Sequence, residues 1–310
     1  MSAQPLPRYP GTAPLAPSVP WFAVRENAPF LILCLMLLNT AAGLSGWAYW
    51  KLTGDNRALV AFFRYPNSLL TLLVCLIEAG LCWEVWRQFE PGDSLRSGWL
   101  WLSLSAVAHL TGRTLSSPGS EQIWFSVVGN LRDTGRVLGG PVQMALLLVG
   151  LAQVAWHCHR MGLWQKLTRV DYALLAMVAA FAVRTVYGMT QYLAAGKPVT
   201  WSIAVSWTSD PLLLMLLAVA VLIRRSMTKL GCGLLANCWR TYVIAIVLTS
   251  MATASSWCLN CSVTPWWTEL GWYAWFLADA AYALAPAFQA AALDRVRTRG
   301  NVLKVIEALR

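Results

Sequence analysis

The chain has 310 residues, of which 57% are hydrophobic and 12% are charged, and its formal net charge is +10. Soluble domains carry roughly 25% charged residues, so this composition argues against a soluble globular protein. The Lys and Arg residues stand in short segments between apolar runs, where membrane topology accounts for them. We therefore expect the lipid bilayer to be the main partner of the chain, and we expect no role in binding nucleic acid.

Residues 1–27 are rich in Pro and contain few large apolar side chains. Such a segment cannot bury enough apolar surface to offset the loss of conformational entropy, so we expect it to be disordered. It also lacks the basic start, short apolar core and small-residue cleavage site of a signal peptide. The first apolar run is therefore expected to act as the targeting element.

Eight apolar runs follow, each long enough or nearly long enough to cross a hydrocarbon core of about 30 Å, which needs roughly 20 helical residues. The third run is the shortest, so a count of seven spans stays open. The sequence predicts an all-α, polytopic integral membrane helix bundle over residues 28–292, without a separate soluble domain. The expected spans are at about 28–50, 67–88, 97–113, 137–157, 171–193, 203–224, 238–258 and 268–292.

The basic residues are distributed unevenly between the two sides of these spans. Sixteen Lys and Arg residues lie on the side of both termini and seven on the other side, while Arg184 lies within a span. Cytoplasmic loops of membrane proteins carry an excess of Lys and Arg. We therefore expect a multi-pass protein of a bacterial-type inner membrane or a plasma membrane, with both termini in the cytoplasm.

Residues 293–310 are predicted to form a basic, amphipathic cytoplasmic tail. Asn301 can cap a helix, and one face of that helix would carry Val302, Val305, Ile306 and Leu309. This apolar face must dock on another surface, and two partners stay open. One is the inner lipid surface, which the basic neighbours favour, and the other is a cytoplasmic or membrane protein.

Ionisable residues within spans are the most informative polar residues, because each costs a few kcal/mol in the bilayer unless it is paired or hydrated. Glu78, Arg184 and Asp279 lie at similar depths, about nine to eleven residues from the outer ends of their spans. His109 and Asp210 lie nearer the outer surface. These five groups predict an outward-facing polar pocket in which a buried arginine is paired with carboxylates.

Helical spacing adds residues to this predicted pocket. Arg184, Tyr187 and Gln191 follow one another at i, i+3 and i+7 and form a polar stripe. Trp275 and Asp279 share one face of the last span. The arrangement is open to two interpretations, which are a site for a small ligand or ion and a structural clamp between two helices.

Asp210 followed by Pro211 is typical of a helix start. A helix from Pro211 to Arg224 covers only about 20 Å, which is too short to cross the bilayer. The sixth span is therefore predicted either to be broken, as in many transporters, or to begin with an ordinary cap at a thin edge of the bundle.

Cys258 and Cys261 form a C-x-x-C pair at the outer surface, where oxidising conditions favour a disulfide. A structural disulfide and a redox site are both open. His157, Cys158 and His159 are adjacent on a helix, where successive side chains point about 100° apart, so they cannot converge on an ion without help from other segments. We expect no catalytic residue, no metal site and no cofactor, haem included.

These features favour a sensory or regulatory module in which a small ligand or ion changes the helix packing and moves the tail. The sequence shows no kinase or cyclase pattern, so we expect any signal to pass to a partner protein. A secondary transporter or proton-coupled permease that uses the same groups is the first alternative. A redox or enzyme accessory subunit built on Cys258 and Cys261 is the second.

Overall fold

The computed structural model describes residues 27–55, 57–116, 129–164, 166–230, 233–258 and 266–309. These residues form nine helices and no strand, so the predicted all-α bundle is confirmed. Residues 1–26 lie outside the described part of the chain, and the disorder of the Pro-rich segment therefore stays a prediction.

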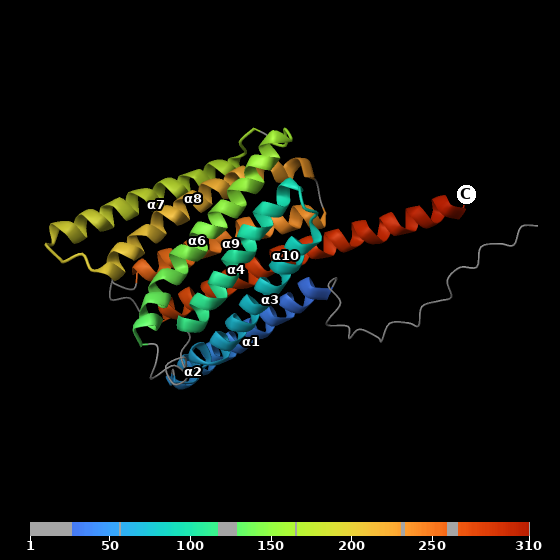
Figure 1. The fold of residues 1–310 in the computed structure, drawn as a ribbon. Helices are drawn as coiled ribbons and strands as arrows, with labels where there is room; N and C mark the ends of the chain where they lie inside the picture. Colours follow the sequence, from blue (N-terminus) through green and yellow to red (C-terminus); the bar gives the residue numbers. More distant parts are fainter. Residues whose placement is uncertain are drawn as a thin grey trace, which may run out of the picture.

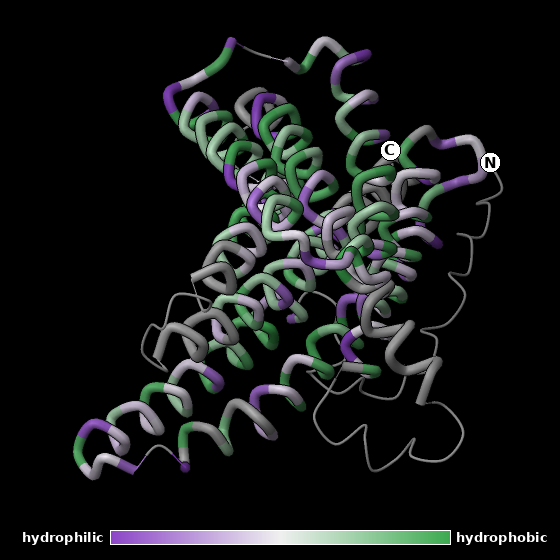
Figure 2. The backbone as a smooth tube through the Cα atoms, turned by 90° about the vertical axis from the view of Figure 1, so that its left-hand side faces the viewer, coloured by the Kyte–Doolittle hydropathy of each residue, from purple (hydrophilic) through white to green (hydrophobic). Residues whose placement is uncertain are grey.

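Eight long helices lie at the positions of the eight predicted spans, and most of their length is hydrophobic (Figure 2). Seven of them are long and apolar enough to cross a membrane, so the chain is a multi-pass membrane protein by these criteria. α4 has 23 residues but is less apolar, because one of its faces carries serines, a histidine and an arginine. The helices are α1 (Ala28–Thr53), α2 (Arg57–Arg64), which is short, α3 (Pro66–Gln88), α4 (Ser94–Ser116), α6 (Gly129–Arg160), α7 (Arg169–Ala194), α8 (Trp201–Leu230), α9 (Leu234–Cys258) and α10 (Trp266–Leu309).

Six of the long helices form a closed ring, because each contacts the next in the order α3, α4, α6, α8, α9, α10 and back to α3. α7 packs against α8, and α1 packs against α3 and α10 (Figure 1). At the start of α7, Arg224 of α8 donates hydrogen bonds to the Asp171 carboxylate at 2.5 Å and to the Thr168 hydroxyl at 2.7 Å. This polar contact fixes α7 to the ring.

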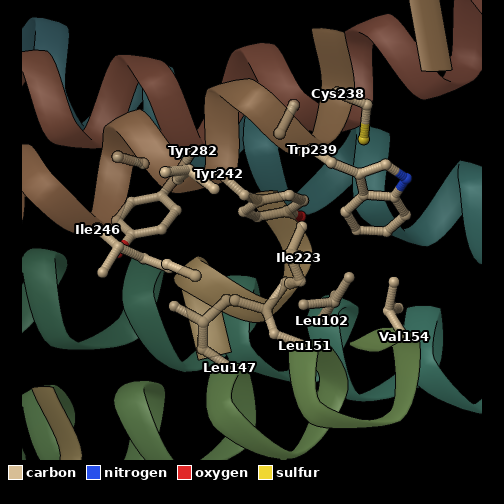
Figure 3. Close-up of a cluster of buried hydrophobic side chains, with 14 of the residues drawn as sticks. Leu102, Leu147, Leu151, Val154, Ile223, Cys238, Trp239, Tyr242, Ile246 and Tyr282 are labelled. Carbon is tan, nitrogen blue, oxygen red and sulfur yellow. The ribbon is translucent and has the colours of Figure 1, made fainter. Parts of the chain in front are cut away.

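One hydrophobic cluster fills much of the ring and takes side chains from all six ring helices (Figure 3). Tyr242 of α9 stacks on Trp239 with ring centroids 5.8 Å apart, and it meets Tyr282 of α10 at 6.3 Å. Leu102 of α4 and Leu151 of α6 belong to the same cluster. The ring is therefore held together by apolar packing around its interior, where any polar group needs a partner.

α4 and α6 approach each other closely because glycines face each other at their contact. A Cβ added to Gly139 would lie 2.8 Å from the Cα of Gly112, which is closer than carbon atoms approach. Small residues at helix contacts let two backbones come together in this way. Two turns earlier on α4, the Ser105 hydroxyl donates to the Gln143 carbonyl oxygen at 2.9 Å. The contact sets the position of the polar face of α4.

α8 runs without interruption from Trp201 to Leu230 and contains Pro211 in its interior. The prediction that this span begins late or is broken at Asp210 is therefore wrong. The Asp210 carboxylate accepts a hydrogen bond from the Thr185 hydroxyl of α7 at 3.2 Å. Pro is tolerated inside a membrane helix because neighbouring groups satisfy the carbonyl that loses its partner, whereas a non-helical stretch would leave many groups unsatisfied.

α10 has 44 residues, passes through the bundle and continues beyond it to Leu309 (Figure 1). No new helix begins at Asn301, so the predicted cap there is wrong, and residues 293–309 extend the last span directly. Within the span α10 is rich in Ala, which lets α1, α3 and α9 pack closely against it. It is the most thoroughly buried of the candidate spans.

Candidate functional site

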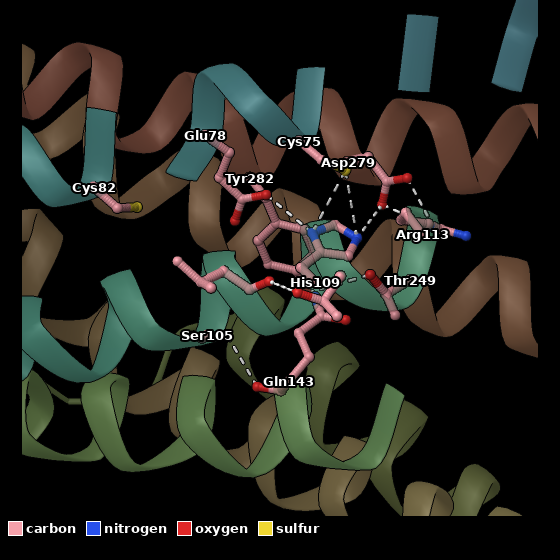
Figure 4. Close-up of polar contacts among 12 residues, drawn as sticks. Cys75, Glu78, Cys82, Ser105, His109, Arg113, Gln143, Thr249, Asp279 and Tyr282 are labelled. Carbon is pink, nitrogen blue, oxygen red and sulfur yellow. Dashed lines mark hydrogen bonds and ion pairs between the residues drawn. The ribbon is translucent and has the colours of Figure 1, made fainter. Parts of the chain in front are cut away.

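A cluster of ionisable side chains lies inside the ring where α3, α4 and α10 meet (Figure 4). Two members on α3 are three residues apart and two on α4 are four residues apart, so each pair points from one helix face. We call this set the buried cluster, and its members are Cys75, Glu78, His109, Arg113 and Asp279.

His109 contacts three other members of the buried cluster. Its Nδ1 lies 2.9 Å from Oε2 of Glu78, and its Nε2 lies 3.1 Å from Oδ1 of Asp279. Sγ of Cys75 lies 3.9 Å from both ring nitrogens. Tyr282 packs edge-on against the imidazole with centroids 6.1 Å apart. His109, Glu78 and Asp279 are each 5% exposed or less, so their neighbours hold the imidazole in one orientation.

Arg113 supplies the positive charge that pairs with Asp279. Its Nη2 lies 2.9 Å and 2.7 Å from the two carboxylate oxygens. The guanidinium also lies over the Trp275 ring, 5.2 Å from its centroid. When His109 is protonated, its charge and that of Arg113 balance the carboxylates of Glu78 and Asp279. Such balance is needed because an uncompensated charge within a bilayer costs at least a few kcal/mol.

A cavity of about 170 Å³ adjoins the buried cluster between α4, α6 and α10. Pockets for drug-sized ligands measure roughly 300–1,000 Å³, so this cavity suits a small solute or an ion with water. It lies toward the end of the bundle at which α6 and α10 begin and α4 ends. Its lining combines polar groups with glycines, and consists of His109, Gly112, Arg113, Gly139, Gly140, Gln143, Met144 and Trp275.

Four of the residues predicted to line one pocket lie together. Glu78 and Asp279 both contact His109 in the buried cluster, and Trp275 lines the adjoining cavity. The outward direction of the pocket depends on the topology of the chain and stays a prediction.

The other four predicted pocket residues lie elsewhere. Arg184, Tyr187 and Gln191 are exposed on α7, and Asp210 lies on α8 within electrostatic range of Arg184. α7 packs against α8 and is not a member of the ring. The predicted pairing of Arg184 with Glu78 or Asp279 is therefore wrong. Similar depth along the membrane normal does not determine which helices are neighbours in the membrane plane.

Sequence reasoning missed two members of the buried cluster. Arg113 is one of the seven basic residues assigned to the side opposite the termini, and Cys75 was not singled out within its span. Arg113 follows His109 by four residues and Cys75 precedes Glu78 by three. Because residues three or four apart share a helix face, this spacing was a signal that could have identified both.

The structure also brings together side chains that can bind a metal ion. Cys75, His109 and Asp279 each offer one ligand atom, and these atoms lie within 4.8 Å of one another. The sequence offers no signal for this group, because its members come from three different helices and Asp279 lies far along the chain from the other two.

The predicted disulfide cannot be placed from the described residues. Cys258 is the last residue of α9, and Cys261 lies outside the described part of the chain. The pairing of these two cysteines therefore stays a prediction.

Comparisons with protein-family models, with curated proteins and with solved structures gave no match. The function is therefore inferred from the buried cluster, the cavity beside it and the helix that leads away from it.

Proposed function

We propose that the protein is a sensory or regulatory membrane module that binds a small solute or ion beside His109 and Arg113. One observation carries this proposal. Asp279, which contacts both of those side chains, lies on the same continuous helix as the basic C-terminal extension. From Asp279 to Leu309 a helix spans about 45 Å at 1.5 Å per residue, so it can carry a movement away from the cluster.

Binding would act on α10 through Asp279. A ligand in the cavity meets Arg113 and His109, which are the two groups that hold the Asp279 carboxylate. A ligand that competes for either group changes the contacts between α10 and α4, and the equilibrium shifts toward whichever helix arrangement binds it more tightly. Packed helix interfaces change between discrete arrangements, so a small change at Asp279 is expected to move α10 as a body.

The secondary transporter is less well supported, because one feature that would have favoured it is absent from α8. An interruption of the sixth span at Pro211 would have favoured that alternative, and α8 is continuous there. Hydrophobic side chains, among them those of Tyr242 and Ile246, fill the ring beside the buried cluster (Figure 3). A module that responds to binding by a shift of α10 fits this packed interior better than a path through it.

Hydrogen exchange of the full chain in lipid nanodiscs tests the proposal. Asp279→Asn keeps the shape of the side chain but removes the charge that holds His109 and Arg113. We expect it to change exchange around the cluster and in peptides that cover residues 293–309. Asp210→Asn is the matched control, because it neutralises a carboxylate in α8 that contacts α7 and not the buried cluster. Changes that stop at the cluster and leave the tail peptides unaltered would contradict the proposed transmission.

A further inference from the structure

We propose that Cys75, His109 and Asp279 bind one divalent transition-metal ion of the zinc class. This inference names the ligand of the proposed sensory module. The metal site itself does not depend on that function, and only its biological consequence rests on it. The three donors come from α3, α4 and α10, and their ligand atoms lie within 4.8 Å of one another. A set of thiolate, imidazole and carboxylate suits Zn²⁺ or Co²⁺, whereas Mg²⁺ and Ca²⁺ prefer oxygen ligands alone.

The distances within this group suit a four-coordinate ion. Metal bonds of about 2.0–2.3 Å at tetrahedral angles place neighbouring ligand atoms roughly 3.3–3.6 Å apart. Sγ of Cys75 lies 3.9 Å from Nε2 of His109, and that nitrogen lies 3.1 Å from Oδ1 of Asp279. Nε2 and Oδ1 therefore already lie at the separation of two ligands of one ion. Sγ of Cys75 is equally far from both ring nitrogens, so this side chain must turn toward Nε2 to complete the set.

Glu78 is placed to orient His109 without binding the ion. Its Oε2 lies 2.9 Å from Nδ1 of His109, on the side of the ring opposite Nε2 (Figure 4). A neutral imidazole that donates from Nδ1 to Glu78 leaves the lone pair of Nε2 on the side of Asp279, where it can bind an ion. Carboxylates that accept from a metal-binding histidine in this way fix its tautomer and raise its basicity.

The charges of the buried cluster also balance when a divalent ion is bound. The thiolate of Cys75 and the carboxylate of Asp279 neutralise the two charges of the ion. Glu78 contributes one negative charge and Arg113 one positive charge, and these two cancel. This balance matters because the cluster is buried within membrane-spanning helices, where a net charge is costly.

The adjoining cavity supplies an access route and room for a fourth ligand. His109 and Arg113 both line it, so water or a small anion in the cavity can reach an ion bound beside His109. Three protein ligands and one exchangeable ligand are typical of zinc sites that react or exchange, whereas purely structural sites use four protein ligands. Because only three protein ligands are present here, the site is expected to exchange its fourth ligand with its surroundings.

Cobalt spectroscopy on the full chain tests the site. The protein is stripped with a chelator in nanodiscs and titrated with Co²⁺, and we expect one ion per chain, a thiolate-to-cobalt charge-transfer absorption and the intense visible bands of four-coordinate cobalt. Zn²⁺ should displace them. Cys75→Ser should remove the charge-transfer absorption. Cys82→Ser is the matched control, since Cys82 is buried on the same helix seven residues further on, and it should retain that absorption.

A measurement on the wild-type chain makes the test independent of how the variants fold, and two more variants extend it. X-ray absorption at the zinc edge of the wild-type chain should report one sulfur ligand with nitrogen or oxygen ligands. Glu78→Gln should keep the cobalt spectrum but weaken Zn²⁺ binding by about 10- to 100-fold, as is usual when a carboxylate behind a metal-binding histidine is lost. A double variant, Cys258→Ser with Cys261→Ser, should behave as the wild type.

The outcomes separate the metal site from the sensory function. Absence of stoichiometric cobalt binding, a zinc edge without sulfur, or an unchanged charge-transfer absorption in Cys75→Ser would overturn the metal site. Zinc binding that leaves hydrogen exchange of residues 293–309 unchanged would support the site and contradict the sensory function. Zinc binding that alters exchange there would support both.

Discussion

The buried cluster is stable only as a set, because each of its charges lies within a membrane-spanning helix and is compensated by a neighbour. Asp279 is 1% exposed and contacts both His109 and Arg113. Truncation of one partner in a buried pair leaves an uncompensated charge, which typically costs about 3–5 kcal/mol. The individual contribution of Arg113 is therefore best measured together with that of its partner.

Arg113→Ala should lower the free energy of unfolding by about 3–5 kcal/mol, because it leaves the Asp279 carboxylate without its guanidinium. Asp279→Asn in the same chain should restore part of the loss, since the uncompensated charge is then gone. Unfolding of the chain in lipid or detergent, analysed as a double-mutant cycle, measures both effects.

Arg184→Ala is the control for this cycle. Arg184 is exposed on α7, and ion pairs of exposed side chains contribute about 0–1 kcal/mol, so we expect a loss of that size. Equal losses for the two arginine variants, or a double variant no more stable than Arg113→Ala alone, would show that Arg113 and Asp279 are solvated separately.

At the scale of the helices, the contact between α4 and α6 determines the shape of the cavity. Gly112 and Gly139 face each other across this contact, and both line the cavity together with Gly140. The separation of the two helices is therefore set by the absence of side chains at these positions. The polar groups of α4 reach α3 and α10 only because α4 is held at this distance.

Gly139→Ala should destabilise the bundle by about 1–3 kcal/mol, because its Cβ would lie 2.8 Å from the Cα of Gly112 and the backbones must separate. Gly140→Ala is the neighbouring control, since no atom lies within 4 Å of a Cβ added there. Alanine in place of glycine in a helix interior stabilises by about 0.5–1 kcal/mol, so this control should be neutral or slightly stabilising. Thermal unfolding of the two variants compares them, and an equal loss in both would refute the steric explanation.

At the scale of the whole molecule, the eight spans predicted from the sequence would place both ends of the chain on one side of the membrane. α10 carries the C-terminal extension beyond the bundle, on the side opposite the end where α10 begins (Figure 1). The excess of Lys and Arg on the side of the termini predicts that this side is cytoplasmic. The cavity would then lie toward the outer surface.

After Arg310, a fused reporter that works only in the cytoplasm should be active, and one that works only outside the cell should be inactive. A reporter inserted after Gly196, in the turn between α7 and α8, should be active only if it functions outside the cell, because this turn lies at the opposite end of the bundle from the tail. The reverse pattern would invert the topology and would place the cavity on the cytoplasmic side.

The sequence by itself determined the all-α membrane fold and the positions of the long helices. Hydropathy is a local property, and the bilayer requires about 20 apolar residues per span, so each span can be recognised without its neighbours. Glu78, His109 and Asp279 were also recognisable, because ionisable residues within spans are costly and need partners. The helix ends were less well determined, since α8 continues through Pro211 and α10 through Asn301.

Only the tertiary structure decided which of these residues meet. A similar expected depth in the membrane made Arg184 a candidate partner of Asp279. In the structure α7 lies against α8, and Arg113 on α4 is the arginine that pairs with Asp279. The order of helices around the ring depends on close contacts such as that of Gly112 with Gly139. Those contacts join residues far apart in sequence, and helical periodicity reports only which residues share a face of one helix. For this reason the sequence predicted polar groups that need partners, and packing determined the partners.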